Sequence, residues 1–188
     1  MLETKDLIRE CISGNAVAQK ELYDRFSPKM YVLCLQYTNE EEEAKDVLQE
    51  GFIKVFGKLK QFREKGSFEG WMRRVFINTA LEKFRNKIAF LAIDERTDQV
   101  SGGVQEKIID QLAANDLLAM IRELSPQYRL VFNLYAIEGY SHKEISKMLH
   151  ISEGTSKSNL SRARGILQGR ITGEKGKSQL NWEKGNAK

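Results

Sequence analysis

The sequence is poor in the features that mark several common classes of protein. Only two of its 188 residues are cysteines, Cys11 and Cys34, and they do not form a metal-type pair such as Cys-x-x-Cys. A disulfide framework or a zinc site is therefore not expected. No stretch approaches the roughly 18 consecutive apolar residues of a membrane span, and the N-terminal Met-Leu-Glu-Thr-Lys-Asp lacks the apolar segment of a signal peptide. We expect a reduced, cytoplasmic protein that is neither exported nor inserted into a membrane.

The motifs of common enzymes are also missing. The chain has no phosphate-binding glycine loop and no Gly-x-Ser-x-Gly motif, and its two histidines, His142 and His150, lack a surrounding carboxylate constellation. We therefore expect no enzyme activity, no cofactor and no metal. The alternation of apolar and polar residues that is typical of β-strands is absent too, and the apolar spacing throughout is helical. The sequence predicts an all-α protein.

Charge of one sign does not dominate the chain. There are 30 lysines and arginines against 26 acidic residues, which gives a formal net charge of +4. The two signs are segregated, because acidic residues crowd residues 39–50 and basic residues gather in the later helices. A chain with both kinds of patch is expected to have both a basic partner and an acidic one, and nucleic acid is an acidic partner.

Residues 139–169 predict two short helices joined by a tight turn. Ser141 and Glu144 form a capping box, and apolar residues at helical spacing carry the first helix to about Leu149. After a turn at residues 150–152, Ser152 can cap a second helix near Thr155. Its apolar stripe is Leu160, Ala163 and Leu167, and its other faces carry Lys157, Ser158, Asn159, Ser161, Arg162 and Arg164. A helix-turn-helix presents a basic recognition helix to the DNA major groove in this way, and the alternative is an ordinary helical hairpin with a solvated charged face.

Earlier in the chain, three helices are expected before residue 60. The first spans about residues 6–12, and the second starts near Ala16 and contains Pro28, which should mark a kink or break near Phe26. That second segment can therefore be two helices or one bent helix. Asn39 can cap the third, whose first turn is acidic. Its predicted buried stripe is Leu48, Phe52, Val55 and Leu59, and its other face offers Asp46, Gln49, Glu50 and Ile53. That face is either solvated or a docking surface.

A turn at residues 62–67 precedes a fourth helix, which Ser67 caps and which runs to about Asn86. Its apolar arc is Phe68, Met72, Val75, Phe76, Ala80 and Phe84, and another face carries Arg74, Asn78 and Arg85. Aromatic residues beside a basic face suit single-stranded nucleic acid, since unpaired bases stack and cations meet phosphates. For Trp71 the alternative is simple core packing.

A flexible linker is expected within residues 88–105, which lose helical periodicity and contain Ser-Gly-Gly. The apolar run at residues 89–93 either extends the previous helix or lies against a partner. Helical spacing resumes at Ile108, and Ser125 with Pro126 starts another helix. The expected division is a domain at 1–90, a linker at 91–106, a helix-turn-helix domain at 107–171 and a basic, disordered tail at 172–188.

Residues 139–146, 151–155 and 157–164 resemble region 4 of extracytoplasmic-function sigma factors, the small members of the sigma-70 family. The resemblance implies that the second helix reads the minus-thirty-five promoter element. The residues it implies for this contact are Thr155, Lys157, Ser158, Ser161, Arg162 and Arg164. The chain departs from the family at Ser156, where Val is usual, and at Asn159, where a basic residue is frequent. The first departure is expected to affect packing and the second sequence preference.

Two further stretches resemble sigma region 2. Residues 46–56, Asp-Val-Leu-Gln-Glu-Gly-Phe-Ile-Lys-Val-Phe, resemble region 2.2, which implies docking on the largest subunit of core RNA polymerase through Asp46, Gln49, Glu50 and Ile53. Residues 62–78 resemble regions 2.3 and 2.4, which implies a loop that captures a flipped base of the minus-ten element and a helix that holds the melted strand. The residues implied for that contact are Phe62, Lys65, Ser67, Trp71, Arg74 and Asn78.

The predicted function is therefore that of a sigma factor, which binds core RNA polymerase and promoter DNA and directs promoter recognition, melting and initiation. The resemblance also implies an inhibitory anti-sigma partner. One alternative is a self-sufficient regulator that binds duplex DNA through residues 139–169 without polymerase. An enzyme acting on single-stranded nucleic acid would need a catalytic cluster, and the sequence contains none.

Overall fold

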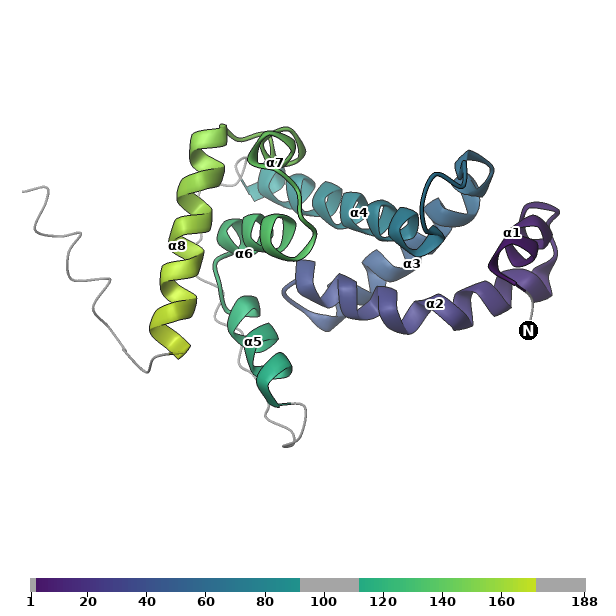
Figure 1. Ribbon diagram of the computed structural model, residues 1–188, viewed down its shortest axis with the longest axis horizontal. Coiled ribbons are helices and arrows are strands. Elements are labelled where there is room, and N and C mark those ends of the chain that lie inside the picture. Colours follow the sequence, from purple (N-terminus) through teal and green to yellow (C-terminus); the bar gives the residue numbers. More distant parts are fainter. Residues whose placement is uncertain (1–2, 92–111, 172–188) are drawn as a thin grey trace, which may run out of the picture. The chain divides into compact units, whose positions relative to one another are not determined.

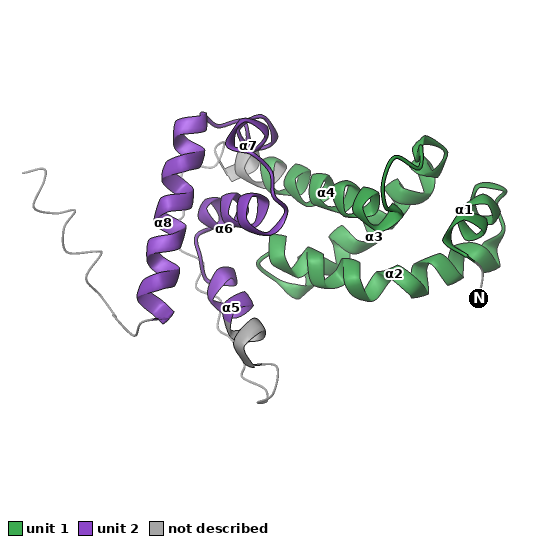
Figure 2. Ribbon diagram, in the orientation of Figure 1, with its two compact units in different colours: residues 1–99 green, residues 100–188 purple. Residues whose placement is uncertain are grey.

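The computed structural model describes residues 3–91 and 112–171, and the side chains of residues 3–85 and 117–171. The chain divides into two compact units, residues 1–99 and residues 100–188 (Figure 2). Within the described ranges every regular element is a helix and no β-strand occurs. The prediction of an all-α fold is confirmed. The predicted linker core and the tail at 172–188 lie outside the described residues.

In its described part, residues 3–91, the N-terminal unit contains four α-helices and one short 3₁₀ turn: α1 (Thr4–Ile12), α2 (Ala16–Tyr37), α3 (Glu41–Lys58), η1 (Leu59–Gln61) and α4 (Phe68–Leu91) (Figure 1). Helices α2, α3 and α4 pack on one another, and α1 packs against α2. Their facing stripes form the core, whose most deeply buried side chains are Leu7, Leu22, Met30, Leu33, Val47, Met72, Phe76, Ile77 and Leu81. Apolar burial on this scale is the main source of stability for such a unit.

Helix α2 runs without interruption through Pro28, so a break there is ruled out. Proline removes one backbone donor and crowds the preceding turn, which costs about 3 kcal/mol in a helix interior. The residues on both sides of it are held in the core, since Phe26, Met30 and Leu33 are all buried. Their burial offsets the cost of the proline. At the start of the helix, Asn15 Oδ1 accepts the N–H groups of the second and third helical residues at 3.0 and 3.3 Å.

The expected cap of α3 is wrong, because the helix begins after Glu40 and no side chain caps it. The backbone N–H of Asn39 instead donates to Glu43 Oε2 at 3.2 Å. The predicted buried stripe is also shifted, since Leu48 is only half-buried while Val47 and Gly51 are buried. The ring of Phe76 on α4 lies directly against Gly51, where a side chain would not fit. The side of α3 that carries Val47 and Gly51 therefore faces the core.

Helix α4 starts as expected, with the N–H of Gly70 donating to Ser67 Oγ at 3.0 Å. It extends beyond Asn86 to Leu91 and takes in most of the apolar run at 89–93, so that run continues the helix as far as residue 91. Ile77 and Leu81 join the predicted apolar arc as buried residues, while Val75 is half-buried.

The C-terminal unit contains α5 (Leu112–Arg122), α6 (Pro126–Phe132), a π-helical turn η2 (Asn133–Ile137), α7 (His142–Leu149) and α8 (Glu153–Ile171). Helices α5, α6 and α7 all contact α8. One buried cluster joins Ile121, Leu124, Ala163 and Leu167. Buried Arg129 links two helices, because its Nη1 donates to the carbonyl of Arg122 at the end of α5 at 3.0 Å. The π-helical turn was not predicted. Gly139 follows it at a φ of +77°, a conformation that suits glycine.

Candidate functional site

The exposed face of α3 is the first candidate surface. Asp46, Gln49, Glu50 and Ile53 lie together there, as their spacing predicts, and with Lys83 of α4 they line a depression of about 180 Å³. Ile53 is 64% exposed although it is a large apolar residue. Lys83 was not part of the prediction, because only the packing of α4 on α3 brings it to this face. The lining of this depression therefore combines carboxylates, an amide, an apolar side chain and the ammonium group of Lys83.

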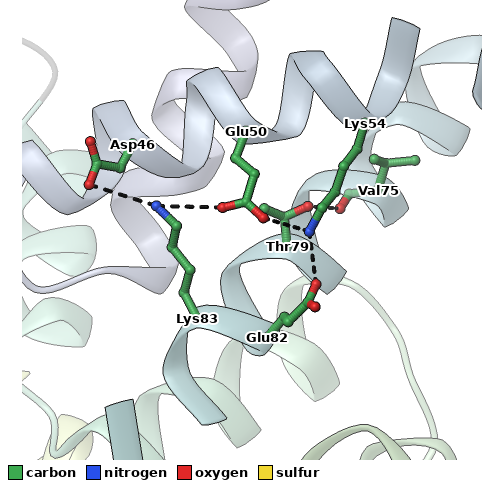
Figure 3. Close-up of polar contacts among 7 residues, drawn as sticks. All are labelled: Asp46, Glu50, Lys54, Val75, Thr79, Glu82 and Lys83. Carbon is green, nitrogen blue, oxygen red and sulfur yellow. Dashed lines mark hydrogen bonds and ion pairs between the residues drawn. The ribbon is translucent and has the colours of Figure 1, made fainter. Parts of the chain in front are cut away.

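Ion pairs cross this face between α3 and α4 (Figure 3). Lys54 Nζ lies 2.7 Å from Glu50 Oε1 and 2.8 Å from Glu82 Oε2. Burial lowers the pKa of Lys54, but the hydrogen bonds to Glu50 and Glu82 outweigh it and the pKa is raised. The hydrogen bond from Lys54 lowers the pKa of Glu82. Lys83 Nζ lies farther from its partners, 3.7 Å from both Asp46 Oδ2 and Glu50 Oε2.

The second candidate surface is the loop before α4 with the start of that helix. Phe62 packs against Phe68 and Trp71, with ring centroids 5.2 and 5.6 Å apart. Phe68 and Trp71 stack at 5.6 Å, and Phe68 also contacts Phe26 of α2. Phe68 is buried, whereas Phe62 and Trp71 are half-buried. Trp71 therefore packs against the buried Phe68 and is also partly exposed to solvent.

The backbone of this loop is shaped by two left-handed residues. Glu64 has a φ of +54° and Gly66 a φ of +121°. Lys5 of α1 pairs with Glu64 at 2.8 Å, which links the first helix to the loop. Lys65 and Ser67 are exposed, and the hydroxyl oxygen of Ser67 is used in the cap of α4.

Arg74 and Asn78 lie one turn apart on α4 and are both exposed. Arg85, further along the same helix, is half-buried. The six predicted minus-ten residues thus belong to one continuous segment, from the end of η1 to the middle of α4. The aromatic pair lies at its start, and the exposed arginine and asparagine follow on the helix.

The third candidate surface is the helix-turn-helix of α7 and α8, which forms as predicted. The capping box is complete, with the N–H of Glu144 donating to Ser141 Oγ at 3.3 Å and the N–H of Ser141 donating to Glu144 Oε2 at 2.9 Å. His150 ends α7 in the left-handed conformation, at a φ of +54°. The N–H of Thr155 donates to Ser152 Oγ at 2.9 Å, which starts α8. A helix-turn-helix with an exposed basic second helix defines a class of DNA-binding domain.

All six predicted minus-thirty-five residues are exposed on α8, namely Thr155, Lys157, Ser158, Ser161, Arg162 and Arg164. Asn159 was placed with them on the open faces of the helix, and that placement is wrong because Asn159 is only 5% exposed. The physical reason is its position four residues before Ala163, which puts it on the same side as the apolar stripe. Asn159 is therefore a packing residue.

Two arginines of α8 contact aromatic residues of α6 and of the π-helical turn η2. Arg162 Nη1 donates to the hydroxyl of Tyr128 at 3.3 Å. The guanidinium of Arg164 lies over the ring of Tyr135, 5.6 Å from its centroid, in a cation–π contact. Tyr135 and His142 border a pocket of about 470 Å³ together with Lys157, Ser161 and Arg164. The sequence offered no local signal for Tyr135 or His142, since each comes from a different segment.

Ser156 is fully buried, and its hydroxyl has a specific partner. Ser156 Oγ lies 2.9 Å from Nδ1 of His142 at the start of α7. The His142 ring also stacks on Tyr135, with centroids 4.6 Å apart and planes 23° from parallel. Where the family usually has Val, Ser156 therefore forms a hydrogen bond that joins the two helices of the helix-turn-helix.

Substituting His142 and Ser156 should reveal this coupling. His142→Ala is expected to destabilise the C-terminal unit by about 1–3 kcal/mol, because it leaves the buried hydroxyl without this partner. Ser156→Ala should cost less, and the double substitution should cost clearly less than the sum of the two. Amide hydrogen exchange of α8 in the full chain measures the effect. Additive costs would show that the two side chains act independently.

Both cysteines of the N-terminal unit are buried and free. Cys34 is 1% exposed, and burial raises the pKa of its thiol to about 12, as expected of an inert buried thiol. Among the residues that the structure describes, no three His, Cys, Asp or Glu side chains gather as metal ligands would. None of the described helices has the length and apolar character needed to cross a membrane.

Comparison with known proteins gives the family. Sigma-70 region 2 matches residues 22–88, and Sigma-70 region 4 matches residues 114–167. Together these matches take in more than half of the chain, and they follow one another in the same order as in the sequence prediction. The chain belongs to the sigma-70 family, within its extracytoplasmic-function (ECF) group.

Individual relatives agree with this assignment. The chain is 31% identical over 153 residues to the ECF RNA polymerase sigma factor SigE of Mycolicibacterium smegmatis, a match covering 79% of this chain and 59% of that protein. It is 26% identical over 176 residues to the ECF RNA polymerase sigma factor SigW of Bacillus subtilis, covering 87% and 94%. The chain thus spans little more than half of SigE and nearly all of SigW. In fold the chain is similar to the sigma factor RpoE of Bartonella quintana, which was solved in a co-crystal with the anti-sigma factor NepR. The TM-score is 0.57 at 20% sequence identity, and the match covers 81% of this chain and 96% of RpoE.

Proposed function

We propose that the chain is a sigma factor that binds core RNA polymerase and directs promoter recognition, DNA melting and the initiation of transcription. The observation that carries the proposal is the pairing of region 2 and region 4 in one chain, at residues 22–88 and 114–167. A helix-turn-helix alone would fit many DNA-binding proteins. Region 2 adds surfaces for polymerase and for single-stranded DNA, which a self-sufficient regulator does not need.

The N-terminal unit has two tasks in this proposal. The exposed face of α3 docks on the largest polymerase subunit through Asp46, Gln49, Glu50 and Ile53. The exposure of the apolar Ile53 beside carboxylates supports this docking role. The segment from Phe62 to Asn78 takes the minus-ten element. A flipped base costs a few kcal/mol of unstacking, and stacking on aromatic side chains with backbone contacts offsets that cost. Phe62, Lys65, Ser67, Trp71, Arg74 and Asn78 are the proposed contacts.

The C-terminal unit binds the duplex DNA of the minus-thirty-five element through α8. Lys157 and Ser161 share one side of the helix, and Ser158 and Arg162 share another, because each pair is four residues apart. Both pairs are exposed, so one side can meet base edges while the other meets phosphates. Thr155 and Arg164 complete the proposed contact.

We also propose an anti-sigma protein as the inhibitory partner and the cytoplasm as the place of action, where core polymerase is found. The similar RpoE structure contains an anti-sigma factor, NepR, but at 20% identity the likeness extends to the fold alone. No catalytic role is proposed, and the relatives are named as sigma factors rather than enzymes.

Migration with core RNA polymerase on a sizing column tests the proposal against the regulator alternative. A sigma factor should travel with the core enzyme and protect promoter DNA from cleavage only in its presence. A regulator should protect duplex DNA by itself and migrate separately from the core. Protection by the chain alone, without migration with polymerase, would reject the sigma-factor proposal.

Replacement of Arg162 tests the phosphate contact in region 4. Arg162→Ala should weaken promoter binding by the chain in complex with core polymerase and lower the slope of log K against log salt by about one, if the guanidinium pairs with one phosphate. Arg122→Ala is the matched control, since Arg122 is exposed and belongs to α5 rather than to the proposed recognition helix. Binding isotherms at several salt concentrations measure both slopes. An unchanged slope for Arg162→Ala removes the phosphate assignment.

A further inference from the structure

The docking face of α3 contains a cation from the same chain. Lys83, on α4, reaches between Asp46 and Glu50 (Figure 3) and lines the same depression as Gln49 and Ile53. We propose that Lys83 is an internal counter-ion of the docking face, which a basic residue of the polymerase displaces from Asp46 when the two proteins bind. This inference rests on the proposed function, because it names what happens at that surface on docking.

The geometry separates Lys83 from the other lysine of this face. Lys54 makes two contacts of 2.7 and 2.8 Å, to Glu50 and Glu82, and only 26% of its side chain is exposed. Those distances are typical of charge-assisted hydrogen bonds, so Lys54 joins α3 to α4 as a structural element. The Lys83 contacts are 3.7 Å long, beyond hydrogen-bonding distance. Lys83 is therefore held loosely and is free to move away from the carboxylates.

The two carboxylates also differ in their availability to a partner. Glu50 makes a short contact of its own to Lys54, at 2.7 Å, through an oxygen other than the one that faces Lys83. The side chain of Asp46 is 71% exposed and pairs with Lys83 only at 3.7 Å. Exposed ion pairs of this kind contribute little to stability, so exchanging one cation for another at Asp46 costs little. Asp46 is the acidic group to which a partner can bind.

The chemistry of the docking face indicates which kind of partner surface would complement it. An exposed isoleucine beside Asp46 and Gln49 suits a helix that presents an apolar side chain next to an arginine or lysine. Lys83 repels such a cation as it approaches, because the two positive charges compete for one carboxylate. Lys83 thus lowers the affinity of the chain for the polymerase, and removing its charge should strengthen docking.

The test compares two lysine substitutions with the same change in net charge. Lys83→Gln should bind core polymerase about three- to tenfold more tightly than the parent chain, the range expected for relief of one competing charge at an interface. Lys20→Gln is the control, because Lys20 is an exposed lysine of α2 that pairs with Asp24 and does not line the depression. Its affinity should stay close to that of the parent chain. The gain from Lys83→Gln should disappear when Asp46 is also replaced, as Asp46→Asn.

Each outcome decides between the hypotheses. If the parent binds the core and Lys83→Gln binds equally or more weakly, then Lys83 is not a competing counter-ion and the inference is rejected while the proposed function stands. If the parent does not bind the core at all, the proposed function fails and the inference fails with it. Thermal unfolding serves as the folding check, and Lys83→Gln should unfold close to the parent because the Lys54 contacts remain.

Discussion

Gly51→Ala should destabilise the N-terminal unit by about 1–3 kcal/mol, the cost of forcing an extra methyl group into a filled core. A Cβ atom at Gly51 would lie closer than 3.0 Å to three atoms of the Phe76 ring. Phe76 is 1% exposed and also packs edge-on against Phe52, with centroids 5.3 Å apart. The ring therefore has little space to move, and α3 and α4 would have to separate.

Gly57→Ala is the control for this prediction, because Gly57 lies on the same helix and a Cβ there would meet no atom within 4 Å. That substitution should stabilise the unit by up to about 1 kcal/mol, since alanine favours the helix over glycine. Urea unfolding followed by Trp71 fluorescence measures both, in a chain where Trp182 is replaced by Phe so that one tryptophan reports. Equal stability of the two variants would mean that α3 and α4 do not pack closely at Gly51.

The double substitution Asp46→Ala, Gln49→Ala should lower the affinity for core RNA polymerase by at least about tenfold, as expected when two polar contacts at the centre of an interface are removed. Both side chains are exposed on the α3 face and line its depression. Neither belongs to the hydrophobic core, so the fold should remain intact. A chain that no longer migrates with the core enzyme but unfolds like the parent would identify the docking helix.

The matched control removes the same residue types elsewhere. Glu41→Ala, Gln61→Ala also deletes one acid and one amide, and both residues are exposed outside the depression. This control should bind the core like the parent chain. Equal loss in the two double variants would attribute the effect to general charge, and equal binding by both would place the docking surface elsewhere.

Sequence reasoning was most accurate where a structure depends on neighbours within one turn. The caps at Ser67, Ser141 and Ser152 form as predicted, because a side-chain oxygen two or three residues from an unpaired N–H needs no distant partner. The common face of Asp46, Gln49, Glu50 and Ile53 follows from the helical period alone. The family resemblance was confirmed for the same reason, since its motifs are local.

The cap expected at Asn39 is a local error, because the N–H of Asn39 donates to Glu43 and the helix begins after Glu40. The other differences depend on which helix packs against which. Spacing could not show that α3 turns Val47 and Gly51 toward α4 in place of Leu48, and it left open whether the segment around Pro28 is one helix or two. Asn159 was expected on a solvent-exposed face because it is polar, but its position beside the apolar stripe buries it.

The sequence by itself therefore determined the all-α class, the helix caps at Ser67, Ser141 and Ser152, the exposed face of α3 and the basic face of α8, since these follow from capping and period. Only the tertiary structure decided which side chains from separate helices meet. It brought Lys83 to Asp46 and Glu50, and it joined His142 of α7 to buried Ser156 of α8. These contacts depend on the packing of whole helices, which is set by the combined fit of many side chains and not by any short pattern.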